Sequence, residues 1–248
     1  MDRILLDRAV ETNQEILIEG PPLEAFRFQG GRIGSIVTVT DSKGKDFRGR
    51  VLRISPREAS LLIFDTFPSP TESPAEIILL QALPEKERME LIIQKATELG
   101  VSAIRVFESS RSISLKERES KQRKAHRWQD IAIKAVQQSR RAKVPQVTYC
   151  PSIEEVLRMC NEEGLRILLW EKEGESLRRM LQQGHPERVY AMVGPEGGFN
   201  PEEVVLAKGH RFVPVKLGQR ILRTETAAIT LVGILQYELG DLGGMSHW

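Results

Sequence analysis

The sequence predicts an α/β protein in which a small N-terminal β-barrel is followed by a larger domain built on a mostly parallel sheet. Up to about Thr66 the chain shows short β-branched or apolar runs separated by turns. A proline-rich stretch without periodicity, Phe67–Pro74, follows these runs. Beyond it, apolar strands alternate with helices, which is typical of a parallel sheet covered by helices on both faces. We therefore expect two domains, residues 1–72 and 73–248.

The expected barrel consists of short strands joined by turns. Clusters of turn-forming residues at 20–22, 30–31 and 41–44 separate the strands. In the longest strand, arginines partly alternate with apolar residues, which indicates one wet, basic face. The strands are expected at Ile16–Ile18, Ile36–Val39, Phe47–Ile54 and Leu61–Phe64.

The larger domain alternates strands with helices. Its first helix is expected to open at Pro84 and to close at Gly100. A long helix is expected through the basic stretch that contains Trp128, and it stops before Pro145. Further helices are expected at Ser152–Asn161 and Thr224–Leu239, and strands at Ile77–Leu80, Ala103–Phe107, Val147–Tyr149, Arg166–Leu169, Val189–Val193 and Phe212–Val215.

The composition is that of an ordinary globular protein of the cytosol. The longest apolar runs are far too short to span a bilayer, and charged residues stand at the start of the chain where a signal peptide would be apolar. We therefore expect a cytoplasmic protein without membrane contact. Cys150 and Cys160 belong to no CxxC pair or Cys/His cluster, so neither a disulfide framework nor a metal site is expected.

The distribution of charge is more informative than the total. The net charge of +2 does not by itself indicate a nucleic-acid partner. The segment from Arg111 to Lys143 is nevertheless strongly basic, and only three acidic residues, Glu117, Glu119 and Asp130, oppose its positive charge. Such a segment can bind RNA phosphates, or it can simply form a solvated helix face. We favour RNA, since Arg105, Arg111 and residues 140–143 extend the basic character beyond one helix.

Two polar turns follow predicted strands, one at 194–199 and one at 217–227. Ligands of parallel sheets gather beyond the carboxyl ends of the strands, and glycines there let the backbone approach a flat ligand. This arrangement favours a nucleotide-like ligand. Neither a GxGxxG nor a GxxxxGK[ST] pattern is present, so a dinucleotide fingerprint and a P-loop are not supported. Taken one at a time, the glycines favour tight turns and a helix cap over a ligand site.

The two turns together form a recognisable pair of motifs. They read Gly194-Pro195-Glu196-Gly197-Gly198-Phe199 and Leu217-Gly218-x-Arg220-Ile221-Leu222-Arg223-x-Glu225-Thr226-Ala227. The pair resembles the RsmE-type 16S rRNA uridine-N3 methyltransferases of the SPOUT superfamily. The resemblance covers roughly Glu85 to Tyr237, and its further matches are Gln94–Val101, Arg111-Ser112, and Gln138-Ser139 with Arg141 and Pro145.

This resemblance implies a C-terminal SPOUT domain with a trefoil knot and an N-terminal PUA-like β-barrel that helps to hold RNA. It implies methylation of N3 of a uridine in 16S rRNA, on the RNA or on the assembled 30S subunit, with S-adenosylmethionine (SAM) as the cofactor. It also implies a homodimer formed through the knot domain. The chain departs from the family pattern at Leu23–Ser35 in the N-terminal domain and at Gln137, where a glutamate is usual.

Methyl transfer to N3 of uridine requires loss of the N3 proton and stabilisation of the resulting negative charge. Arginines near the uracil oxygens and a carboxylate that accepts the proton or orients an arginine would meet these needs. The catalytic candidates are Arg111, Arg141, Arg223 and Glu225. The expected cofactor-binding residues are Leu169, Trp170, Val193, Gly194, Glu196, Gly197, Leu217, Gly218, Ile221, Leu222, Arg223, Thr226 and Ala227.

Alternatives remain for single residues and for the function. Glu225 stands where a helix begins and can simply complement the helix dipole. Trp170 can be a packed residue at the end of the sheet. The chain could also be a non-catalytic SPOUT protein that binds RNA, or a SPOUT methyltransferase that acts on tRNA. The intact motif from Leu217 to Ala227 favours an enzyme.

Overall fold

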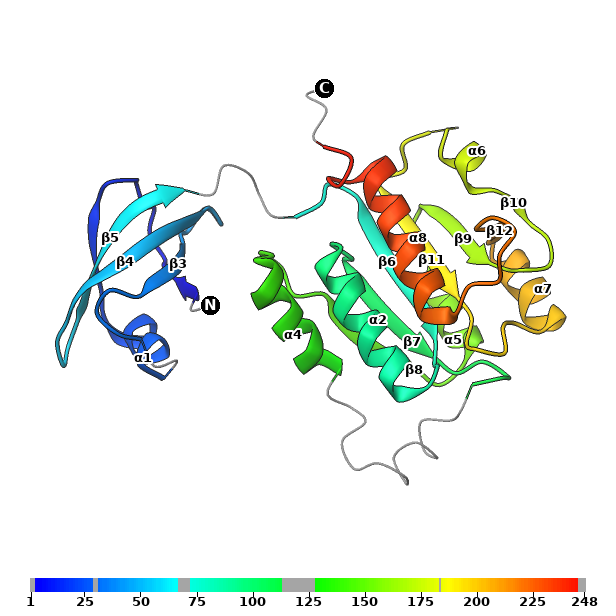
Figure 1. The fold of residues 1–248 in the computed structure, drawn as a ribbon, viewed down its shortest axis with the longest axis horizontal. Coiled ribbons are helices and arrows are strands. Elements are labelled where there is room, and N and C mark those ends of the chain that lie inside the picture. Colours follow the sequence, from blue (N-terminus) through cyan, green and yellow to red (C-terminus); the bar gives the residue numbers. More distant parts are fainter. Residues whose placement is uncertain (1–2, 29–30, 67–71, 113–127, 183, 245–248) are drawn as a thin grey trace. The chain divides into compact units, whose positions relative to one another are not determined.

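A computed structural model describes residues 3–28, 31–66, 72–112, 128–182 and 184–244, and the chain forms two compact units, 1–71 and 72–248 (Figure 1). Glu72 belongs to the second unit because its carboxylate accepts hydrogen bonds from Arg141 Nη2, at 2.7 Å, and from the backbone N–H of Lys143, at 2.7 Å. No helix among the described residues is long and apolar enough to span a membrane.

The first unit is a half-barrel sheet with a single described helix, α1 (Gly20–Phe28). The strand order is β1-β3-β4-β5-β2, antiparallel except for the parallel pair β1 and β3. Phe26, Phe47 and Leu61 are fully buried in its core. The strands are β1 (Arg3–Leu5), β2 (Glu15–Ile18), β3 (Ile36–Thr40), β4 (Asp46–Ile54) and β5 (Ala59–Thr66).

Helix α1 differs from the sequence prediction, which placed a turn at 20–22. Gly20 adopts a positive φ of 56°, and Pro21 and Pro22 then occupy the first turn of the helix, where no backbone N–H is needed. The helix brings Leu23 and Phe26 into the core of the unit. Prolines in this position can begin a helix as well as a turn, so their presence alone did not decide between the two.

The second unit contains a seven-stranded, wholly parallel sheet in the order β10-β12-β9-β11-β6-β7-β8, which confirms the predicted α/β class. The central strands are apolar throughout; in β6, for instance, every residue after the first is buried. The strands are β6 (Glu76–Ala82), β7 (Ala103–Phe107), β8 (Gln146–Cys150), β9 (Leu165–Leu169), β10 (Glu175–Ser176), β11 (Arg188–Val193) and β12 (Val213–Lys216).

Helices cover both faces of this sheet, and each face has its own hydrophobic core. Apolar residues of α2, α4, α6 and α8 fill one core, while those of α5 and α7 fill the other. Figure 1 shows α2, α4 and α8 lying side by side in front of the sheet. The helices are α2 (Lys86–Glu98), α4 (Trp128–Ser139), α5 (Ile153–Arg158), α6 (Leu177–Leu181), α7 (Pro201–Gly209) and α8 (Thr224–Leu239).

The predicted helix ends agree best at α8, which spans Thr224–Leu239 as expected. The basic helix is described only as α4, because residues 113–127 lie outside the described part of the chain. The short elements β1, β10 and α6 were not predicted. They span only two to five residues, too few for a periodic pattern to appear.

Candidate functional site

A cavity of about 380 Å³ opens at the carboxyl ends of β9, β11 and β12. The parallel arrangement brings these three strand ends to one edge of the sheet, so the segments that follow them share one wall. This volume lies within the range of cavities that hold a nucleotide-sized ligand. The segments that line it are 169–171, 193–199, 215–224, Arg88 and Ala227.

The turn after β11 approaches the cavity closely with its backbone. A Cβ atom at Gly194 would lie 3.3 Å from the ring of Phe199, which is fully buried and stacked on Phe107 with 6.3 Å between ring centres. Gly198 has a φ of +65° and donates its N–H to the carbonyl oxygen of Pro195 at 3.0 Å. The backbone conformation of Gly198 therefore requires glycine, whereas at Gly194 the ring of Phe199 leaves little room for a side chain.

A buried polar network joins this turn to the start of α8. Gln81, fully buried at the end of β6, donates from Nε2 to the carbonyl oxygen of Gly194 at 3.2 Å and to Thr224 Oγ1 at 3.1 Å. Thr224 in turn donates to the same Gly194 oxygen at 2.6 Å. Three segments far apart in the sequence are thereby held together at the cavity wall, and none of these residues was singled out for this role from the sequence.

The second turn forms the more exposed side of the cavity. Gly218 has a φ of +77°, and the chain then reaches Arg223, the residue that precedes the first turn of α8. Leu217 and Leu222 are half-buried, whereas Ile221 is 86% exposed. An apolar side chain exposed at the rim of a cavity is available for contact with the flat face of a ligand.

The structure brings together all the predicted cofactor residues except Thr226, which is exposed and does not line the cavity. Trp170 satisfies both interpretations that the sequence left open. It is 9% exposed and belongs to a hydrophobic core, yet it also lines the cavity. Its Nε1 is buried and has no hydrogen-bond acceptor among the described residues.

Arg111 lies behind the glycine turn and does not line the cavity. Its Nη1 donates to the carbonyl oxygen of Gly197 at 2.5 Å, and its Cδ would be 3.1 Å from a Cβ atom at Gly197. Nearby, the buried Glu203 accepts from the backbone N–H of Ser110 at 2.8 Å and completes the capping box of α7. These hydrogen bonds hold the loop after β7 against α7 and against the turn that borders the cavity.

The structure does not bring Arg141 to the cavity. Its side chain is buried, and Nη1 donates to the carbonyl oxygens of Thr97 and Val101, both at 2.9 Å. Its Nη2 forms an ion pair with Glu72 at 2.7 Å. These contacts close the C-terminal end of α2 and the loop before β7, so the arginine stabilises the fold rather than approaching a bound ligand.

Arg88, on α2, lines the cavity, although it was not predicted as a site residue. Its guanidinium lies between carboxylates: Nε is 3.5 Å from Glu196 and 3.7 Å from Glu85, and Nη1 is 3.9 Å from Glu225. Glu196 also accepts from the backbone N–H of Glu85 at 2.9 Å. The i,i+3 pair Glu85 and Arg88 resembles ordinary helix-surface charges, which is why its position beside the cavity escaped the sequence analysis.

Arg223 and Glu225 lie at the start of α8, as predicted. Arg223 lines the cavity and is exposed. The side chain of Glu225 is 14% exposed, and its Oε2 is buried without a hydrogen-bond donor among the described residues. Glu225 does not itself line the cavity, but it lies 3.9 Å from Arg88, which does.

The remaining candidates lie away from the cavity. Arg105 donates to the carbonyl oxygen of Met159, and Arg140 and Lys143 are exposed. Burial raises the pKa of the Cys160 thiol to about 11 and also raises the pKa of Cys150, so both side chains behave as core residues. In the described part of the chain, no three His, Cys, Asp or Glu side chains come close enough to hold a metal ion.

The chain is similar to known RNA methyltransferases. The family model of the RNA methyltransferase domain matches residues 71–236. The ribosomal RNA small subunit methyltransferase E of Bacillus subtilis is 29% identical over 219 residues, 85% of this chain and 85% of that protein.

Two solved structures that contain SAM are also similar. The ribosomal RNA small subunit methyltransferase E of Neisseria gonorrhoeae, bound to S-adenosyl methionine, has 31% identity and a TM-score of 0.74, covering 98% of this chain and 99% of that one. A methyltransferase of Legionella pneumophila in complex with SAM has 31% identity and a TM-score of 0.72, covering 97% and 99%.

Proposed function

Because the chain belongs to the RNA methyltransferase domain family, we propose that it is an enzyme that transfers the methyl group of SAM to N3 of a uridine in 16S rRNA. The observation that carries this proposal is the cavity at the carboxyl ends of β9, β11 and β12. It is lined by the same glycine turns on which the resemblance to the RsmE-type enzymes rests.

The residues that line the cavity fit SAM. Gly194, Gly197 and Gly218 leave backbone groups accessible, and the half-buried Leu217 and Leu222 provide an apolar surface for the adenine ring. Backbone groups of the same lining are available to the polar edge of the ring. When bound, SAM supplies a methyl group activated by its positively charged sulfur.

The uridine would bind where Arg223 lines the cavity, next to Glu225, which lies beside the lining residue Arg88 without lining the cavity itself. Glu225 is the proposed acceptor of the N3 proton, since its Oε2 is buried beside Arg88 and lacks a hydrogen-bond donor. Arg223 would stabilise the negative charge that spreads to the uracil oxygens. The alternative for Glu225, complementing the dipole of α8 from its first turn, is compatible with this role.

Arg111 would act on the cofactor turn instead of on the base. Its guanidinium donates a hydrogen bond to the Gly197 carbonyl oxygen, and its side chain packs against Gly197 of the turn. We assign it to positioning the backbone that borders the cavity. Arg141 would serve stability through its buried contacts with Thr97, Val101 and Glu72.

The wider assembly follows from the resemblance. We propose a trefoil knot in the second unit, a homodimer formed through that unit, and RNA binding by the PUA-like first unit in the cytoplasm. The basic face predicted for β4 supports RNA binding, because Arg50 is exposed there and lies over the ring of Phe64 at 5.8 Å. The target would be 16S rRNA within the assembled 30S subunit.

The experiment that tests the function is methyl transfer from labelled SAM to 30S subunits that lack the modification, followed by mapping of the label. We expect label at N3 of one uridine in 16S rRNA. Transfer to tRNA with none to 30S subunits would replace the rRNA assignment by the tRNA alternative. RNA binding without any transfer would favour the non-catalytic alternative, whereas Glu225→Gln should bind SAM normally and transfer slowly.

A further inference from the structure

The carboxylates at the cavity differ in how they are compensated. Glu196 accepts a backbone hydrogen bond from Glu85 and lies 3.5 Å from Arg88, and Glu225 lies 3.9 Å from the same arginine. Glu171 lines the cavity as Glu196 does, whereas Glu225 does not, but Glu171 forms no hydrogen bond or ion pair with any described residue. The lining therefore contains one carboxylate whose charge no described residue compensates.

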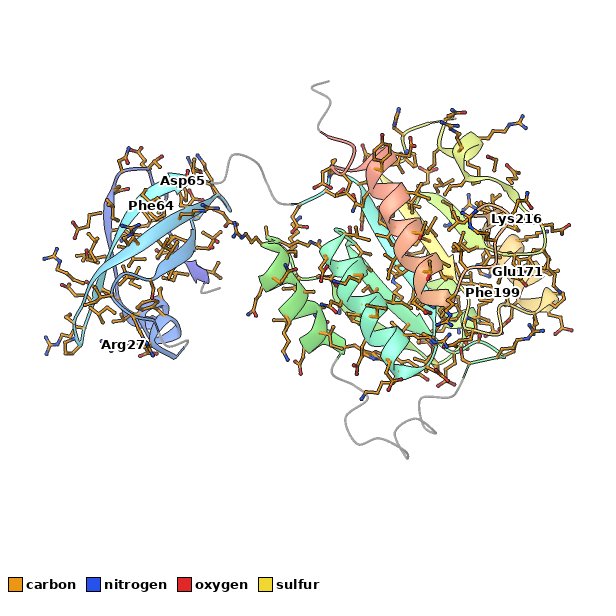
Figure 2. The ribbon with its side chains drawn as sticks, in the orientation of Figure 1. Arg27, Phe64, Asp65, Glu171, Phe199 and Lys216 are labelled. Carbon is orange, nitrogen blue, oxygen red and sulfur yellow. The ribbon has the colours of Figure 1, made fainter. Side chains whose placement is uncertain are left out.

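Glu171 is positioned over the glycine turn by the end of β9. The backbone N–H of Trp170, the preceding residue, donates to the carbonyl oxygen of Val215 at 3.1 Å, which fixes the chain beside β12. A Cβ atom at Gly198 would lie 3.5 Å from one carboxylate oxygen of Glu171 and 3.6 Å from the other. Figure 2 shows Glu171, Phe199 and Lys216 gathered at the same end of the second unit.

The basic residues that line the cavity belong to a different segment from Glu171. Lys216, the last residue of β12, and Arg220 and Arg223, in the connection to α8, all line it, and none of them forms an ion pair with a described residue. The lining thus presents an uncompensated carboxylate after β9 and uncompensated cations after β12. A ligand that carries an ammonium and a carboxylate group a few bonds apart matches such a separation of charge.

We propose that Glu171 binds the α-ammonium group of SAM, so that the α-carboxylate is directed toward the cations of residues 216–223. This inference rests on the proposed function and identifies the residue that recognises the amino-acid part of the cofactor. The adenosine part is held by backbone groups and apolar side chains and does not depend on Glu171. The carboxylate therefore selects ligands by their ammonium group and orients them in the cavity.

Calorimetric titration of three ligands separates these contributions. SAM and S-adenosylhomocysteine both carry the α-ammonium group, whereas 5′-methylthioadenosine lacks the amino-acid part and keeps the adenosine and the sulfur. Glu171→Gln has nearly the same shape without the charge. We expect it to weaken binding of SAM and S-adenosylhomocysteine by roughly tenfold to a hundredfold, the usual worth of a hydrogen bond to a charged group. Binding of 5′-methylthioadenosine should be unchanged.

Glu173→Gln is the matched control, because Glu173 belongs to the same loop, is exposed, and lies 4.0 Å from Lys208 away from the cavity lining. It should bind all three ligands as the unmodified protein does. An equal loss for all three ligands in Glu171→Gln, or no loss for any, would overturn the inference. If the unmodified protein binds none of them, the proposed function itself fails; if it binds SAM and Glu171→Gln does so equally, only the role of Glu171 fails.

Discussion

Gly197 is the residue at which the cofactor turn meets the loop after β7. A Cβ atom there would lie 3.1 Å from Arg111 Cδ and 3.3 Å from Arg111 Cβ, so a larger side chain must displace the arginine or turn toward the cavity. We expect Gly197→Val to abolish SAM binding in calorimetry while the far-UV circular dichroism stays unchanged. Gly209→Ala is the control, since nothing lies within 4 Å of a Cβ there. Unchanged SAM affinity in Gly197→Val would contradict the assignment of this turn to the cofactor.

The two roles considered for Arg111 make different kinetic predictions. If its guanidinium positions the Gly197 carbonyl, as the 2.5 Å contact indicates, Arg111→Ala should weaken SAM binding by about tenfold. Arg111→Lys keeps the stem and one donor and should recover part of that loss. If the side chain stabilises the uracil anion instead, SAM affinity would be unchanged and single-turnover methylation would slow. Calorimetry together with single-turnover kinetics decides between the two.

For single residues, the sequence predicted the backbone positions of the site better than the roles of its side chains. The glycine turns were predicted because a turn motif is contiguous in the sequence. Arg88 and Gln81 were missed because their relation to Glu225 and Thr224 exists only after folding. Arg141 was assigned to catalysis from its motif, but burial and its contacts with backbone carbonyls are properties of the fold.

Among the elements, α8 could be predicted to the residue and α1 could not. In α8, apolar residues at helical spacing end just before Gly240, so propensity and burial favour the same structure. In α1, the two prolines after Gly20 favoured a turn, while the packing of Leu23 and Phe26 against the half-barrel favoured a helix. Tertiary contacts decided the outcome, and these contacts cannot be inferred from a short segment alone.

The end of α2 depends on Arg141. Replacing this arginine by alanine leaves Glu72 without its cationic partner and leaves the carbonyl oxygens of Thr97 and Val101 without this donor. We expect Arg141→Ala to lower the free energy of unfolding of the second unit by about 3–5 kcal/mol, as is usual when one partner of a buried ion pair is removed. Urea denaturation measures this loss.

Lys143→Ala is the control, because Lys143 contacts Glu72 through its backbone N–H and its side chain is exposed. Its free energy of unfolding should stay within about 0.5 kcal/mol of the unmodified protein. If Arg141→Ala kept full stability but lost methyl transfer, a catalytic role for Arg141 would be restored.

For the whole molecule, strand alternation predicted a parallel sheet with helices on both faces, and this is confirmed. A knot depends on which side of a loop the chain passes, and hydrophobic periodicity carries no information about that path. The trefoil knot therefore stays a prediction from the resemblance. The same holds for the dimer, because an apolar helix face packs equally well against a partner or against its own core.

The division into two units predicts that the cofactor site does not depend on the first unit. Every residue that lines the SAM cavity belongs to residues 72–248, and the buried network of Gln81, Gly194 and Thr224 lies in the same unit. A fragment of residues 72–248 should therefore bind SAM with the affinity of the full chain, within about threefold, as measured by calorimetry. Its affinity for 16S rRNA should fall, because the basic face of β4 has been removed. Loss of SAM binding in a folded fragment would mean that the first unit contributes to the cofactor site.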